Sequence, residues 1–151
     1  MNDKLKLRAE DAEDLAVIAA CLQDARLPLT EMVFQPDAQR FMAAFTRYRW
    51  ERCADPHASA ELTEVSAALV FEEIRAVKYR GLDRVGAGEE LGLLTIATEP
   101  GTDTLIRVDL VFSGDVHIQL RTDRIRCRLD DFDEPRPASK APGDHFAGDD
   151  G

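Results

Sequence analysis

The sequence has little of what usually points to a particular chemistry or cell compartment. Its three cysteines, Cys21, Cys53 and Cys127, form no C-x-x-C pair, and their odd number indicates free thiols in a reducing compartment. No hydrophobic run approaches the roughly 18 residues that span a bilayer. The first residues also lack the apolar stretch of a secretory signal. We therefore expect a cytoplasmic protein that has no contact with a membrane.

Motifs for metal binding and catalysis are missing as well. His57, His117 and His145 are far apart in the sequence, with no H-x-x-x-H spacing, so we expect no metal and no cofactor. A nucleophilic Cys127 would need a base, and the nearest histidine in the sequence is His117. Strand alternation points His117 outward and Cys127 inward, which keeps the two side chains out of hydrogen-bond range. The sequence therefore predicts no catalytic residue.

Aromatic residues make up only 7% of the chain, but an apolar content of 44% is sufficient for the mainly aliphatic core of one domain. The net charge of -10 argues against unspecific binding of nucleic acid or anionic membranes by the chain as a whole. Residues 130–151 hold seven acidic residues against two basic ones. We expect residues 1–132 to form a single domain and residues 133–151, which are acidic and rich in proline and glycine, to form a disordered tail.

Alternation of apolar and polar residues is the strongest pattern that the chain does have. Three successive runs between residues 103 and 129 place an apolar residue at every second position. The pattern predicts antiparallel strands with one buried face. The buried faces are expected to be Ile106, Val108, Leu110 and Phe112 in the first run, Val116, Ile118 and Leu120 in the second, and Ile125, Cys127 and Leu129 in the third.

The loop between the first two runs decides their register. A two-residue turn would set Leu110 opposite His117 and place a polar side chain on the buried face. An odd-numbered loop over residues 113–115 instead sets Leu110 opposite Ile118. Because a slip of one residue turns the whole apolar set of a strand toward solvent, we predict the odd-numbered loop.

The beginning of the chain predicts one helix. Asp11 stands where an N-cap is expected, and Leu15, Ile18 and Leu22 follow on one face at helical spacing. Arg26 would then lie in the last turn, where its charge complements the helix dipole. We expect this helix to cover one side of the sheet.

Further runs typical of strands occur at residues 29–35, 41–51, 65–71, 74–80 and 91–98, mostly with hairpin-length connections. One or two helices and about eight strands in so small a domain predict an α+β fold with a mainly antiparallel sheet. We expect the sheet to be strongly bent or closed into a small barrel, of the pleckstrin-homology type or a split barrel, with the N-terminal helix packed on it.

Several segments resemble one bacterial family. They are LKLRAEDAEDLAVIAACLQDA at 5–25, RYRWE at 47–51, FEEIRAVKYRGLDR at 71–84, and RVDLVFSG and RIRCRLDDF at 107–114 and 124–132. On these segments the chain resembles the family known as domain of unknown function 2948. The resemblance implies a bacterial source and a single domain. It implies no activity and no site residue, because the family has no assigned activity.

Arginine-rich stretches supply the candidate binding residues. Arg124, Arg126 and Arg128 recur at every second position, which spaces their side chains by about 6.6 Å along one strand face, suited to successive phosphates of an extended strand. Acidic neighbours such as Glu51 and Glu73 offer a different reading, in which they pair with the arginines. A second, basic and aromatic segment contributes Arg47, Tyr48, Arg49, Trp50 and Arg52.

We predict a non-enzymatic binding or adaptor module with a protein partner, because the chain lacks a coherent catalytic or metal constellation. An enzyme whose pocket is built from scattered residues is the first alternative. Binding of a polyanion or a nucleic acid through the arginine-rich faces is the second. The sequence predicts neither the identity of the ligand nor the oligomeric state.

Overall fold

The computed structural model describes residues 4–52, 62–86, 88–100 and 105–140. Nearly all of its regular structure is strand, and all strand pairs are antiparallel. The strands are β1 (Lys6–Ala9), β2 (Arg26–Pro28), β3 (Met32–Gln35), β4 (Arg40–Tyr48), β5 (Thr63–Phe71), β6 (Ile74–Arg80), β7 (Glu90–Pro100), β8 (Ile106–Phe112), β9 (Val116–Thr122), β10 (Cys127–Asp131) and β11 (Arg136–Pro137).

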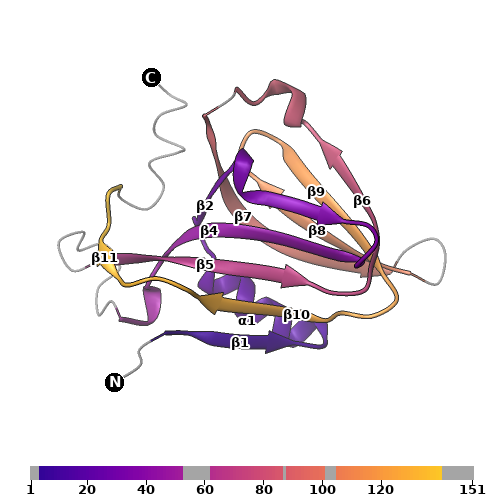
Figure 1. Ribbon diagram of the computed structural model, residues 1–151, viewed down its shortest axis with the longest axis horizontal. Helices are drawn as coiled ribbons and strands as arrows, with labels where there is room; N and C mark the ends of the chain where they lie inside the picture. The colour runs from indigo at the N-terminus through magenta and orange to yellow at the C-terminus, as the bar shows by residue number, and fades with distance from the viewer. Residues whose placement is uncertain (1–3, 53–61, 87, 101–104, 141–151) are drawn as a thin grey trace.

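The strands form one sheet in the order β1-β10-β5-β4-β2-β7-β8-β9-β6, with β3 beside β4 and β11 beside β5. Figure 1 shows that the sheet curls strongly, so that β4, β5, β10 and β1 lie in front of β7, β8 and β9. The sheet does not close, because its end strands β1 and β6 do not pair. The predicted α+β fold with a strongly bent antiparallel sheet is confirmed, in its open form.

The predicted register between β8 and β9 is confirmed. Leu110 lies opposite Ile118 and Val108 lies opposite Leu120, and all four side chains are buried. The loop at residues 113–115 takes up the odd residue with two positive φ angles, 78° at Gly114 and 59° at Asp115. Their left-handed backbone allows the chain to reverse while both apolar sets stay on the inner face.

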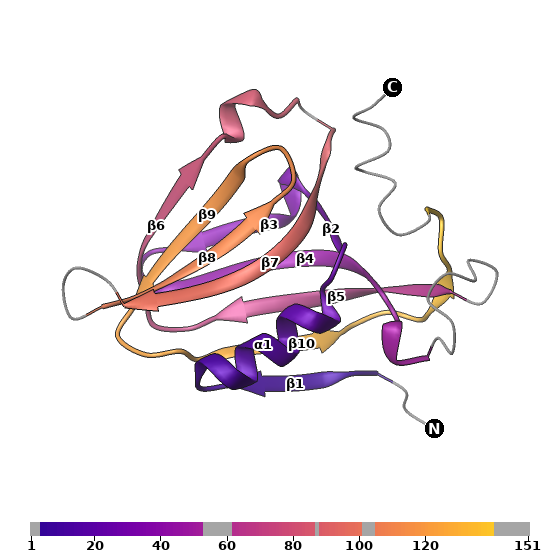
Figure 2. The same ribbon diagram turned by 180° about the vertical axis from the view of Figure 1, so that it is seen from behind.

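One α-helix, α1 (Ala12–Cys21), occurs in the described residues. Asp11 is its N-cap as predicted, with Oδ1 accepting a hydrogen bond of 2.8 Å from the backbone N–H of Asp14. Leu15 and Ile18 are buried, and Figure 2 shows α1 lying on the inner side of the sheet beside β1 and β7. It is too short to cross a membrane, as is every helix in the described part of the chain.

The predicted position of Arg26 in the last helical turn is wrong. The helix ends at Cys21, and Asp24 then adopts a left-handed conformation with φ 61°. This turn redirects the chain into β2, where Arg26 lies between Thr46 of β4 and Gly92 of β7. The guanidinium is therefore buried in the middle of the sheet, and its Nη2 donates a hydrogen bond of 3.0 Å to Glu64.

The core fills the space that the curled sheet and α1 enclose. Phe45 of β4 and Phe112 of β8 stack across it, with ring centroids 6.3 Å apart and ring planes 7° from parallel. Aliphatic side chains make up most of the remaining core, as the composition predicts. Since both halves of the sheet contribute to one cluster, the described chain folds around one core.

The C-terminal part of the described chain continues along β5 beyond Phe132, where the composition predicts the domain to end. Arg136 of β11 lies opposite Glu64, and the backbone N–H of Ala138 donates to Leu62 O at 3.1 Å. The sheet therefore extends into the segment that was expected to be a tail. The rest of that segment, including His145, lies outside the described residues, as do Cys53 and His57.

Candidate functional site

The outer face of the sheet across β1, β10, β5, β4 and β3 has a row of five residues in register. Arg8 lies opposite Arg128, Arg128 opposite Val70, Val70 opposite Met42, and Met42 opposite Val33. Residues directly opposite one another in antiparallel strands point to the same face of the sheet. The row therefore places two arginines beside three apolar residues on one surface, which Figure 1 views from the front.

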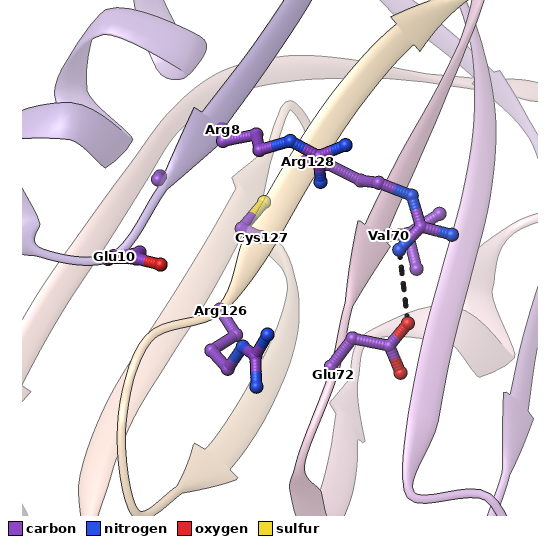
Figure 3. Close-up of a pocket in the computed structure, with 8 residues that line it drawn as sticks. Arg8, Glu10, Val70, Glu72, Arg126, Cys127 and Arg128 are labelled. Carbon is purple, nitrogen blue, oxygen red and sulfur yellow. Dashed lines mark hydrogen bonds and ion pairs between the residues drawn. The ribbon is translucent and has the colours of Figure 1, made fainter.

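Guanidinium groups gather at the arginine end of this row. A hollow of about 90 Å³ lies between β1, β10 and β5, and Arg8, Arg126 and Arg128 are among the residues that line it. Figure 3 shows Arg8 reaching from β1 toward β10, while Arg128 extends over β5 toward Glu72. We call this the arginine hollow and define it by Arg8, Arg126 and Arg128.

Glu72 holds one wall of the arginine hollow in place. Its carboxylate accepts hydrogen bonds from Nη1 of Arg128 at 3.1 Å and from Nε of Arg40 at 3.0 Å. Burial by itself would raise the pKa of Glu72, but the hydrogen bonds from Arg40 and Arg128 outweigh it and lower that pKa below its usual value. Glu72 is therefore a carboxylate at neutral pH that is already shared by two arginines.

The other two arginines of the hollow have weaker attachments or none. Nη1 of Arg126 lies 3.4 Å from Oε2 of Glu73, and the same oxygen accepts a hydrogen bond of 3.0 Å from Arg124. The side chain of Arg126 is 52% exposed. The exposed guanidinium of Arg8 has no hydrogen bond or ion pair with the residues that the structure describes. Donor capacity is therefore free at the rim of the hollow.

With this geometry established, comparison with known proteins gives one match. A family model described as "Protein of unknown function (DUF2948)" matches residues 5–145. The chain belongs to this family. The predicted resemblance is thus confirmed, and the DUF2948 match also includes β11. No curated protein and no solved structure matches the chain significantly.

The DUF2948 chain keeps the predicted arginine pattern on one face of β10 and of the residues just before it. Arg126 and Arg128 line the hollow, and Arg124 lies at the edge of the same surface through its contact with Glu73. Acidic neighbours pair with these arginines, as the second reading of the sequence proposed, and they are Glu72 and Glu73 in the turn between β5 and β6. The pairs leave each arginine partly exposed, so they do not remove the positive surface.

Arg47, which the sequence suggested as a binding residue, lies in the interior of this DUF2948 protein. Its side chain is 0% exposed and donates to Asp131, to Glu51 and to the carbonyl oxygen of Tyr48. Burial would lower the pKa of Arg47, but the hydrogen bonds to Asp131 and Glu51 raise it above its usual value. Arg47 thus has no surface with which to contact a partner.

The neighbours of Arg47 in the basic and aromatic segment also serve packing. Arg26 lies over the buried ring of Tyr48, with its Cζ 5.8 Å from the ring centroid. The ring of Trp50 packs against Tyr48, and its Nε1 donates to the carbonyl oxygen of Gln23 at 3.1 Å. Arg49 is largely buried and donates to Thr63. Arg52 ends the short 3-10 helix η2 (Trp50–Arg52) and is exposed.

His117 and Cys127 lie on opposite faces, as predicted. Nδ1 of His117 is 3.1 Å from Oδ2 of Asp109, and its Nε2 is 3.1 Å from Oδ1 of Asp115. Both ring nitrogens therefore face carboxylates. Cys127 is buried, and this burial raises the pKa of its thiol far above the usual value, which keeps it protonated.

Sequence reasoning did not identify three of the residues that line the arginine hollow, namely Arg8, Glu72 and Val70. Leu5 and Leu7 alternate with Lys6, and the same alternation places Arg8 on the outer face of β1. The alternation does not indicate which strand pairs with β1. No group of three or more His, Cys, Asp or Glu side chains that could hold a metal ion occurs among the described residues.

Proposed function

We propose that this DUF2948 protein is a non-enzymatic binding module that holds the carboxylates of an acidic segment of a protein partner in its arginine hollow. One observation carries the proposal. Three guanidinium groups converge on one hollow, from Arg8 of β1, Arg128 of β10 and Arg126 just before β10, and Arg8 is unpaired among the described residues.

The chemistry of the guanidinium group favours an oxoanion as ligand. Its planar N–H groups match the two oxygens of a carboxylate, and such charged hydrogen bonds are stronger than neutral ones. The two acidic side chains that line the hollow are Glu10 and Glu72, and Glu72 is shared with Arg40. Arg8 has no carboxylate partner among the described residues, so a carboxylate bound in the hollow would supply one.

A short acidic segment fits this surface better than a nucleic acid does. Glu73 lies between Arg124 and Arg126, and Glu72 lies beside Arg128, so carboxylates interrupt the arginine stripe along its length. A continuous phosphate backbone would meet these acids as well as the arginines, and the net charge of -10 adds a repulsion that grows with ligand length. One or two carboxylates of a peptide reach the hollow without crossing the stripe.

Fluorescence anisotropy with labelled hexaglutamate as the probe tests the proposal. The double variant Arg8→Ala with Arg126→Ala should weaken binding about tenfold or more, because it removes two charge-assisted contacts. Lys78→Ala with Arg80→Ala is the matched control, since both residues are exposed on β6 outside the hollow. The control should bind as the wild type does, and binding should weaken between about 50 mM and about 200 mM salt.

Three results would overturn the proposal. They are no binding of hexaglutamate, an equal loss in the Lys78 and Arg80 control, and tighter binding of labelled hexathymidylate than of hexaglutamate. The last result would favour the nucleic-acid alternative. Circular dichroism of both double variants verifies that the fold is retained, because every substitution lies on the outer surface.

A further inference from the structure

The outer face beside the arginine hollow has a second depression, and its lining is mostly apolar. A trough of about 290 Å³ is lined by residues that include Val33, Met42, Ala44, Ala68 and Val70. We call it the apolar trough and define it by these five residues. Ala44 of β4 lies directly opposite Ala68 of β5, so two methyl side chains adjoin where larger residues would fill the space. Val33 on the edge strand β3 is 45% exposed.

Val70 joins the two depressions, because it lines both the arginine hollow and the apolar trough. In the row across the sheet, Arg128 lies one strand from Val70 and Met42 lies one strand from it on the other side. Neighbouring strands are about 4.8 Å apart, which places the backbones of Arg128 and Met42 about 10 Å apart. Figure 3 shows the side chain of Arg128 extending over β5 to the position of Val70.

We infer that the apolar trough and the arginine hollow form one binding face for an extended peptide segment. The segment carries an aliphatic side chain in the trough and carboxylates in the hollow. An extended chain rises about 3.3 Å per residue, and only every second side chain points to the same face. Because two residues span only about 6.6 Å, the aliphatic residue and a carboxylate should lie about four residues apart. This inference rests on the proposed function and specifies its ligand.

Charge complementarity selects an acidic partner segment over a second copy of this chain. A second copy that met this face with the same face would bring the same arginines to it. The two chains would also repel each other, since each has a net charge of -10. A partner segment that joins an aliphatic side chain to acids satisfies both depressions at once. The arginines then supply orientation and the trough supplies buried apolar area.

Two labelled hexapeptides test the ligand, Leu-Gly-Gly-Glu-Glu-Glu and Gly-Gly-Gly-Glu-Glu-Glu. The leucine peptide should bind about fivefold more tightly, because partial burial of one leucine is expected in the trough. A third peptide, Leu-Glu-Glu-Glu-Gly-Gly, has the same composition but places no glutamate four residues from the leucine. It should bind no more tightly than the peptide without leucine.

Ala68→Leu tests the place of binding by filling the trough with a larger side chain. The variant should abolish the advantage of the leucine peptide and leave the affinity for the glycine peptide unchanged. Ala97→Leu is the matched control, since Ala97 lies opposite Asp109 on the outer face of β7 and is also partly exposed. It should leave the affinities of both peptides as they are in the wild type.

The outcomes separate this inference from the proposed function. If none of the peptides binds, the proposed function fails and the inference fails with it. If the leucine and glycine peptides bind equally, the arginine hollow binds acids but the inference about the trough is overturned. A leucine advantage that survives in Ala68→Leu also overturns it, because the aliphatic contact then lies elsewhere. Equal binding of the two leucine peptides rejects the proposed spacing.

Discussion

Arg47 and Asp131 form a two-pronged ion pair inside the protein. Nε of Arg47 donates to Oδ1 of Asp131 at 2.9 Å, and Nη2 donates to Oδ2 at 2.8 Å. The side chains are 0% and 2% exposed. Glu51 and the carbonyl oxygen of Tyr48 accept the remaining hydrogen bonds of the guanidinium. The pair joins the end of β4 to the end of β10, two strands that are not neighbours in the sheet.

Removing one member of this pair should destabilise the fold strongly. Asp131→Ala leaves Arg47 buried with fewer acceptors, and the loss of one partner of a buried ion pair costs about 3 kcal/mol or more. Asp130→Ala is the control, because Asp130 is partly exposed and lies 3.5 Å from Arg128 at the surface. It should cost about 0.5 kcal/mol. Urea unfolding followed by fluorescence of the single tryptophan, Trp50, measures both changes. Equal losses would show that the buried pair is dispensable.

The register of β8 and β9 predicts a contrast between two adjacent positions. Leu110 is 1% exposed and faces the core, so Leu110→Asp places a carboxylate in apolar surroundings at a cost of several kcal/mol. Val111 lies opposite His117 on the outer face and is partly exposed. Val111→Asp should therefore cost about 1 kcal/mol or less. The two thermal midpoints make the comparison, and an unchanged midpoint for Leu110→Asp would contradict the inner face.

Alternation was sufficient to predict β8, β9 and their loop because the information is local. Arg47 lies on the inner face in the structure, two residues after Phe45 on the face that also holds Phe41 and Ala43. Its charge nevertheless favoured a surface position in the sequence, because the compensating Asp131 is 84 residues away. Arg26 was predicted in the helix because the helical pattern of the sequence continues past Cys21. The turn at Asp24 that ends the helix depends on tertiary packing, which the local pattern does not include.

The arginine hollow shows the same limit. The outward position of each arginine follows from strand alternation, but the meeting of Arg8 with Arg128 depends on the pairing of the first strand with the tenth. A single sequence does not contain that pairing. The apolar trough likewise needs Ala44 and Ala68 in register, which only the pairing of β4 with β5 establishes.

The lowered pKa of Glu72 makes a prediction about acid stability. Because its folded-state pKa is below the ordinary value of 4.5, the carboxylate contributes stability that is fully present above that value and is lost as the pH falls through the folded-state pKa. Glu72→Gln should reduce stability at neutral pH and make the fall in stability between about pH 7 and about pH 3 smaller. Glu134→Gln is the control, since that side chain is 88% exposed. Urea midpoints across this range measure the effect, and an unchanged pH profile in Glu72→Gln would contradict it.

The C-terminal segment separates into two parts that truncation should distinguish. The carboxylate of Glu64 is 4% exposed and accepts hydrogen bonds from Arg26, from Arg136 and from the backbone N–H of Ser139. A chain that ends at Pro135 removes two of these donors and leaves a buried carboxylate poorly compensated, at a cost of about 2 kcal/mol.

A chain that ends at Lys140 keeps both donors. The residues that it lacks include a single large apolar side chain, Phe146, and we expect them to add little buried area. The thermal midpoint should therefore stay near the full-length value for this chain and fall clearly for the chain that ends at Pro135. Arg136→Ala in the full-length protein should reproduce part of that fall, because it removes one donor to Glu64. A large loss in the chain that ends at Lys140 would show that residues 141–151 contribute to the packed domain.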